Sequence, residues 1–124
     1  MGATGRVMTD ILAQMEAYRD AVNAADVRCV LDARDVNPPC LLIRPPTMNF
    51  RFGRGCISAT WAAWLYLPDA GQINAVRMGV PMLTQIQDAL STVGVAILSA
   101  TPTDFQPPDG GTVPGFILNW NTSQ

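Results

Sequence analysis

The sequence predicts an α+β domain, in which a mainly antiparallel sheet of four to five strands packs against an N-terminal helix and a second, proline-containing helix. Three observations predict this class. The run from Cys56 to Leu67 alternates as a half-buried strand does. Two other segments repeat apolar residues at helical spacing, and clusters of proline and glycine separate short extended runs. With 124 residues, the chain is expected to form a single domain over residues 1–124.

The run from Cys56 to Leu67 is the predicted central strand. At about 3.4 Å per residue it would span roughly 40 Å, so its two ends are expected to serve different neighbours. One face is apolar throughout, with Ile57, Ala59, Trp61, Ala63, Leu65 and Leu67. The opposite face begins with Ser58 and Thr60 and ends with Ala62, Trp64 and Tyr66. The second half is therefore apolar on both sides, and we expect it to be covered twice, by a helix and by another element.

Two segments are predicted to be helices. The first begins near Val7, after a glycine-rich start at residues 1–6 that is expected to fray, and its apolar positions are Met8, Ile11, Leu12, Met15, Tyr18 and Val22. The second begins at Gln72, and a stripe is expected to face the sheet through Ile73, Val76, Val80, Leu83, Ile86 and Leu90. Pro81 lies inside this helix and is expected to kink or split it, because proline removes a backbone hydrogen bond.

Shorter strands complete the prediction. They are Val27–Leu31, Cys40–Arg44, Thr47–Phe52 in a hairpin with the central strand, a run through Val95, Ile97 and Ser99, and Phe116–Trp120. Residues 101–115 are predicted to be a long connection rich in proline and glycine. Either a disordered loop or an arm that docks on a partner fits this composition, and Phe105 slightly favours the arm.

The composition argues against several kinds of function. The formal net charge is −2, no histidine is present, and all eight basic residues are arginines scattered along the chain. A basic face for duplex nucleic acid is therefore not expected, and the commonest general base and metal ligand is missing. Neither a cofactor nor a metal is expected. The three cysteines lie far apart and are interpreted as packed apolar residues in a reducing compartment.

No motif with a clear catalytic chemistry emerges. Asp32 and Asp35 are the only close carboxylate pair on a constrained loop, and a solvated turn explains them more simply. Cys40 has no visible base to activate it, and the segment from Gly53 to Gly55 lacks the following helix that a phosphate cradle needs. The sequence shows no apolar run long enough to span a membrane and no export signal, so synthesis in a cytoplasm is expected.

The order of elements resembles that of the small tail terminator proteins of long-tailed phages. The likeness in residues is greatest between Asp32 and Asp69, where the segments shared with versions from phages of actinobacteria are Asp35–Pro39, Arg44–Thr47, Phe50–Gly53, Trp61 and Leu67–Asp69. About a third of the chain matches at the level of residues, and Pro81 departs from the pattern.

The resemblance implies a non-enzymatic virion protein at the neck of the tail, assembled in the host cytoplasm. Such a protein forms a hexameric ring that caps the tail tube, stops its polymerisation and joins it to a head-completion or connector protein. Viral DNA would pass through the ring without specific binding, and no membrane is involved. The expected interface residues are Arg51, Arg54, Trp64, Tyr66, Phe105 and Asp109.

Two alternatives remain open from the sequence. A head-closure or tube subunit of a phage would share the composition and the setting. A small-molecule-binding α+β domain, with a pocket between sheet and helices, would instead predict a monomer or dimer that melts at a higher temperature with its ligand.

Overall fold

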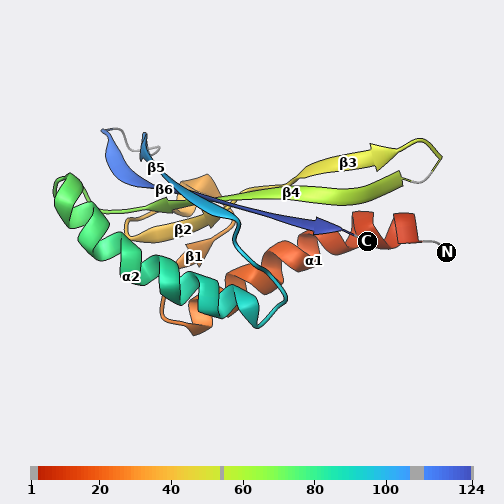
Figure 1. Cartoon of the computed structure of the whole chain (residues 1–124), viewed down its shortest axis with the longest axis horizontal. Helices are drawn as coiled ribbons and strands as arrows, with labels where there is room; N and C mark the ends of the chain where they lie inside the picture. Colours follow the sequence, from red (N-terminus) through yellow and green to blue (C-terminus); the bar gives the residue numbers. More distant parts are fainter. Residues whose placement is uncertain (1–2, 54, 107–110, 124) are drawn as a thin grey trace.

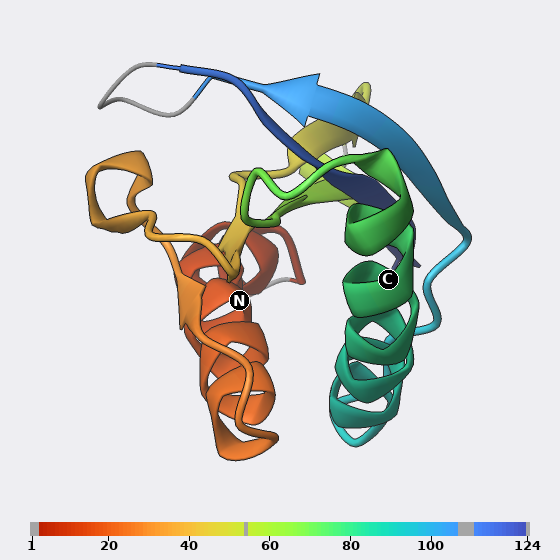
Figure 2. The same cartoon turned by 90° about the vertical axis from the view of Figure 1, so that its left-hand side faces the viewer.

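The computed structural model describes residues 3–53, 55–106 and 111–123, which form a six-stranded sheet with two long helices on one of its faces (Figure 1). The helices are α1 (Ala3–Ala24) and α2 (Gln72–Ser91), and a short 3-10 helix covers Ala33–Asp35. The strands are β1 (Cys29–Val30), β2 (Cys40–Ile43), β3 (Thr47–Arg51), β4 (Gly55–Tyr66), β5 (Ser99–Phe105) and β6 (Val113–Ser123). Seen from the end, α1 and α2 lie beside each other beneath the sheet (Figure 2).

The sheet follows the order β1-β2-β4-β6-β5, and β3 pairs with β4 off this path. Strand β6 runs along one edge of β4, and β2 and β3 share the other edge. On that shared edge, β2 pairs with residues 63–66 of β4 and β3 pairs with residues 55–60. The two halves of the long strand therefore do serve different neighbours, and the predicted hairpin is confirmed. The α+β class is confirmed too.

The predicted strand count needs correction, and the mainly antiparallel character of the sheet is matched in part. The sheet has six strands where four to five were expected, and it is mixed, because β1 pairs with β2 in parallel. The link between them contains Pro38, Pro39 and the 3-10 helix. A parallel link this short lacks the long crossover helix that usually signals such a pair in a sequence.

The main core lies between the sheet and the two helices. Trp61 of β4 and Trp120 of β6 are paired across the strands and stack with their ring centroids 6.0 Å apart. Tyr18 of α1 meets both rings edge-on, at 5.0 Å from Trp61 and 5.7 Å from Trp120. The Trp61 indole nitrogen also donates a hydrogen bond to Thr122 Oγ1 at 3.0 Å. The apolar face of the predicted central strand is confirmed as core from Ala59 onward, whereas the Ile57 side chain lies outside the described part of the structure.

A second apolar cluster covers the opposite face of the sheet. Its buried members are Leu42, Tyr66 and Phe105, and half-buried residues pack around them: Val30, Val36, Trp64, Val113 and Ile117. The prediction that the second half of the central strand is covered on both sides is thus confirmed. The helices cover one side, and Phe105 with the segment around Val36 covers the other.

The stripe expected to turn α2 toward the sheet is wrong in its first half. Ile73 is 71% exposed, and Val76 and Val80 are each 52% exposed. Ala75 and Gly79 are buried instead. A Cβ atom added at Gly79 would lie 2.7 Å from Phe116 Cε2 and 3.0 Å from Leu67 Cδ1, so only the smallest residue fits there. Close packing of the helix backbone on Phe116 decides which face turns inward, and the branched residues turn outward.

Two expectations about the helices are also wrong. The glycine-rich start was expected to fray to residue 6, but α1 begins at Ala3; residues 1–2 and the Met8 side chain lie outside the described part. The split expected at Pro81 does not occur, because α2 is one helix from Gln72 to Ser91. Because Pro81 is exposed, water can reach the outer side of the helix, where a carbonyl loses its backbone donor.

Side chains explain why two predicted strands are shorter or absent. The Asn23 amide accepts from Cys29 N at 2.7 Å and donates to Cys29 O at 3.2 Å, which limits β1 to two residues. Gln87 of α2 likewise donates to Val95 O at 3.2 Å and accepts from Ile97 N at 2.8 Å. Residues 95–98 are therefore held against α2 and do not form the expected strand, which begins only at Ser99.

The predicted long connection at residues 101–115 is wrong over most of its length. Residues 101–105 belong to β5 and residues 113–115 to β6, and the two strands pair from Ser99 with Asn119 to Phe105 with Val113. Phe105 is only 7% exposed. It is part of the fold, and not an aromatic residue exposed on a flexible tip.

Candidate interaction surfaces

The fold brings three of the expected interface residues together on the face of the sheet opposite the helices. The Phe105 ring lies 5.3 Å from the Trp64 ring and 4.6 Å from the Tyr66 ring, between centroids. Tyr66 and Phe105 are buried, so they have little surface left for a partner. Trp64 is half-buried and is the member of the three that can still contact another molecule.

An arginine covers part of the exposed Trp64 ring. The Arg44 guanidinium carbon lies 4.3 Å from the centroid of Trp64, within the range of a cation–π contact. Arg44 is the last residue before Pro45 and Pro46, which end this extended segment. The result is a small surface of one aromatic ring and one positive charge, held in place by the cluster below it.

Of the remaining expected interface residues, Arg51 is the one that the structure describes. It is exposed and lies at the end of β3, in the other half of the sheet. Arg54 and Asp109 lie outside the described residues. The four described residues therefore do not form one site.

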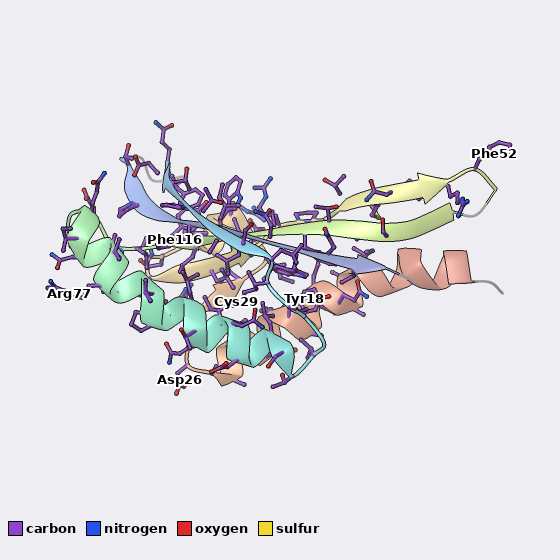
Figure 3. All side chains as sticks on the ribbon, viewed as in Figure 1. Tyr18, Asp26, Cys29, Phe52, Arg77 and Phe116 are labelled. Atoms are coloured by element: carbon purple, nitrogen blue, oxygen red, sulfur yellow. The ribbon has the colours of Figure 1, made fainter. Side chains whose placement is uncertain are left out.

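A projecting aromatic end of the β3–β4 hairpin was not singled out from the sequence. Phe50 is more than half exposed, and Phe52 is fully exposed. Figure 3 shows Phe52 at the outer end of this hairpin, at one end of the long axis of the molecule. We call Phe50, Arg51 and Phe52 the hairpin tip.

A second exposed apolar surface lies on α2. Ile73, Val76 and Val80 recur at intervals of three and four and are all exposed, and we call them the helix stripe. Figure 3 shows Arg77, which lies among these residues in the sequence, at the opposite end of the molecule from Phe52. Isolated exposed apolar residues are ordinary, but a contiguous stripe on a helix is typical of a protein contact.

Two hollows run beside the helix stripe, between α2 and the edge strand β5. The first has a volume of about 330 Å³, and its lining includes Val76, Pro102, Asp104 and Phe116. The second has a volume of about 370 Å³, and its lining includes Val80, Asp88, Leu98 and Ala100. Both linings are mainly apolar, and among the described residues each carries a single charged one, an aspartate in both cases.

A signal for the helix stripe was present in the sequence. The buried residues Ala75, Gly79, Ile86 and Ala89 also follow helical spacing, and a glycine in the middle of a helix indicates close packing of the backbone. The exposure of Phe52 had a weaker signal, its place directly before Gly53 in a turn.

The carboxylate pair is explained by local structure. Asp32 caps the 3-10 helix by accepting from Arg34 N at 2.9 Å, and it forms an ion pair with Arg34 at 2.8 Å. These bonds from Arg34 lower the pKa of Asp32 to about 2. Asp35 enters this loop through its backbone, where its carbonyl oxygen accepts from Arg28 at 2.9 Å. Both residues therefore act in holding the turn between β1 and β2.

Two of the cysteines are buried free thiols, as the sequence predicted. Burial raises the pKa of Cys29 to about 12, and it also raises the pKa of Cys40. The Cys56 side chain lies outside the described part of the structure. Among the described residues, no group of three or more acidic or sulfur ligands is placed to hold a metal ion.

We expect the folded protein to resist alkylation at Cys29 and Cys40. In a Cys56→Ala variant at pH 8, iodoacetamide should label neither thiol until urea unfolds the chain, because the attacking species is the thiolate. Mass spectrometry of the labelled protein is the measurement. Rapid labelling of the folded chain would contradict the buried placement of both residues.

Burial of Cys29 also links the free energy of unfolding to pH. The unfolded chain ionises Cys29 near pH 9, whereas the folded chain does so near pH 12. The free energy of unfolding should therefore fall as the pH rises from 9 toward 12.

Comparison of the sequence with models of protein families finds no match, and comparison with curated proteins finds no significant match. In the part of the chain that the structure describes, neither helix combines the length and apolar character needed to cross a bilayer.

Proposed function

We propose that this protein is a structural subunit of a phage virion, a tail terminator that forms a hexameric ring. The ring caps the tail tube, stops its polymerisation and offers the surface to which the head-completion or connector protein attaches. Viral DNA passes through its centre without specific binding. The subunit has no catalytic role and is assembled into the tail neck in the host cytoplasm.

The observation that carries this proposal is the pair of exposed apolar surfaces at opposite ends of one small chain. The hairpin tip and the helix stripe both place branched or aromatic side chains in water. A subunit that meets a neighbour on each side needs two such surfaces, and a monomer needs neither. The segment between Asp32 and Asp69, which carries the resemblance to tail terminators, includes the whole hairpin tip.

A phage component of another kind, such as a head-closure or tube subunit, needs the same two surfaces. It differs in what it does to a growing tube, because a tube subunit adds to the tube and a terminator ends it. The hollows beside α2 favour a second candidate, a small-molecule-binding domain, since their volumes fall at the lower end of the range of ligand sites. However, Val76, Pro102 and Asp104 in the first lining are exposed, so this hollow is open to solvent.

Native mass spectrometry and negative-stain imaging of the full chain separate the terminator from the small-molecule-binding domain. The terminator predicts particles of six copies with a central hole, at a population that rises with protein concentration. A small-molecule-binding domain predicts a monomer or dimer whose melting temperature rises with a metabolite. A monomer that shows this metabolite-dependent melting would overturn the proposal.

A further inference from the structure

The hairpin tip projects from the fold, the first hollow is concave, and the two lie at opposite ends of the molecule (Figure 3). The tip presents two phenyl rings at one end of the long axis, and Phe52 is fully exposed there (Figure 3). The hollow is near the first turns of α2, at the other end (Figure 1). The two features therefore cannot meet within one copy.

We propose that the hairpin tip of one copy inserts into the hollow between α2 and β5 of the next copy. The hollow has a volume of about 330 Å³, and apolar cavities of only about 150 Å³ bind benzene, so a phenyl ring fits. Phe52 enters the hollow against Val76, Pro102 and Phe116. Phe50, two residues earlier near the end of β3, packs against the helix stripe.

The charges of the two surfaces are also complementary. Arg51 lies between the two phenylalanines of the tip. Asp104 is the charged residue of the first lining, Asp88 is that of the second, and neither lining includes a basic residue among those that the structure describes. Insertion brings Arg51 toward Asp104, which favours this orientation of the two copies and makes the contact sensitive to salt.

The edge strand β5 is better suited to contact the side chains of another copy than to pair with an added strand. It ends the sheet, and such an edge can in principle pair with an extended segment from another protein. Pro102, in the middle of β5, has no backbone donor and interrupts such pairing. Since Pro102 disfavours an added strand, the proposed contact places a side chain of the hairpin tip in the hollow beside Pro102.

A contact of this kind joins two different surfaces, so each copy can bind one neighbour with its tip and another with its hollow. Such a head-to-tail contact gives a ring when the rotation between copies closes, and an open filament when it does not. The inference deepens the proposed hexamer and rests on the proposed function for the closure of the ring, but the contact itself can be tested without it.

The test uses two variants of the full chain, Phe52→Ser at the tip and Val76→Asp in the hollow. Both residues are exposed, so the fold should be retained, which circular dichroism and thermal melting check. In sedimentation velocity and native mass spectrometry, each variant alone should self-associate at least tenfold more weakly than the wild type. Leu12→Ser and Val93→Asp are the matched controls, because they change exposed apolar residues away from both surfaces and should associate as the wild type does.

Mixing the two variants gives the sharpest result. Phe52→Ser keeps an intact hollow and Val76→Asp keeps an intact tip, so the mixture should form one-to-one pairs that do not grow further. Absence of pairs in the mixture, wild-type association of either variant, or a wild type that stays monomeric at every concentration would each overturn the inference.

These outcomes are distinct from failure of the proposed function. If association persists unchanged in both variants and the particles still end tail tubes, the terminator stands and the contact lies elsewhere. If tip and hollow join copies into open filaments that leave tube growth unaffected, the contact stands and the terminator fails.

Discussion

Replacing Trp61 with alanine is expected to destabilise the fold by about 3–5 kcal/mol, which is a large part of the free energy of unfolding of a typical domain. Trp61 is fully buried, stacks on Trp120 and lies edge-on to Tyr18. Its removal leaves a cavity at the point where α1, β4 and β6 meet. Urea unfolding followed by circular dichroism measures the loss.

Trp61→Phe serves as the matched variant, because it keeps an aromatic ring but loses the hydrogen bond to Thr122. We expect a cost of roughly 1–2 kcal/mol for this change, from the lost bond and a smaller cavity. If Trp61→Ala unfolded at the same urea concentration as the wild type, the position of Trp61 in the core would be wrong.

Replacing Phe105 with alanine is expected to cost about 3–5 kcal/mol as well, because this residue fills the second cluster. Its ring contacts Trp64 and Tyr66 and covers the face of the sheet opposite the helices. The expectation reverses the earlier hypothesis of a docked arm, under which the free chain would tolerate the change and only assembly would suffer. Thermal melting of the isolated variant decides between the two.

Phe50→Ala is the control for this prediction. Phe50 also lies near the end of a strand but is more than half exposed, so its replacement should change stability by no more than about 0.5 kcal/mol. Equal melting temperatures for Phe105→Ala and Phe50→Ala would show that the second cluster does not stabilise the fold.

The sequence predicted well wherever alternation and turn residues act locally. The run from Cys56 to Leu67 alternates apolar and polar residues over its first half, and Gly53 turns the chain, so the hairpin and the core face of β4 followed directly. The double coverage of Trp64 and Tyr66 also followed, because apolar residues on both faces of a strand require cover on both sides. These features depend on neighbours in the sequence.

The sequence failed where contacts between distant residues decide the outcome. Which face of α2 turns inward depends on the fit of Gly79 against Phe116, 37 residues away in the sequence. The strand expected at Val95 is prevented by the side chain of Gln87. Phe105 was placed in a long connection, either a disordered loop or a docked arm, because prolines and glycines dominate its surroundings. Pro102 is nevertheless tolerated in β5, which is an edge strand. Because the inward face of α2 was predicted wrongly in its first half, the helix stripe was not recognised as a surface.

The most direct test of the account is the length of tail tubes grown with and without this protein. Tube protein of the phage that the proposed function implies is allowed to polymerise, and the tubes are imaged by electron microscopy. If the protein is a tail terminator as proposed, its addition stops growth and the tubes end in a ring of six copies. Tubes of unchanged length with bare ends would contradict it.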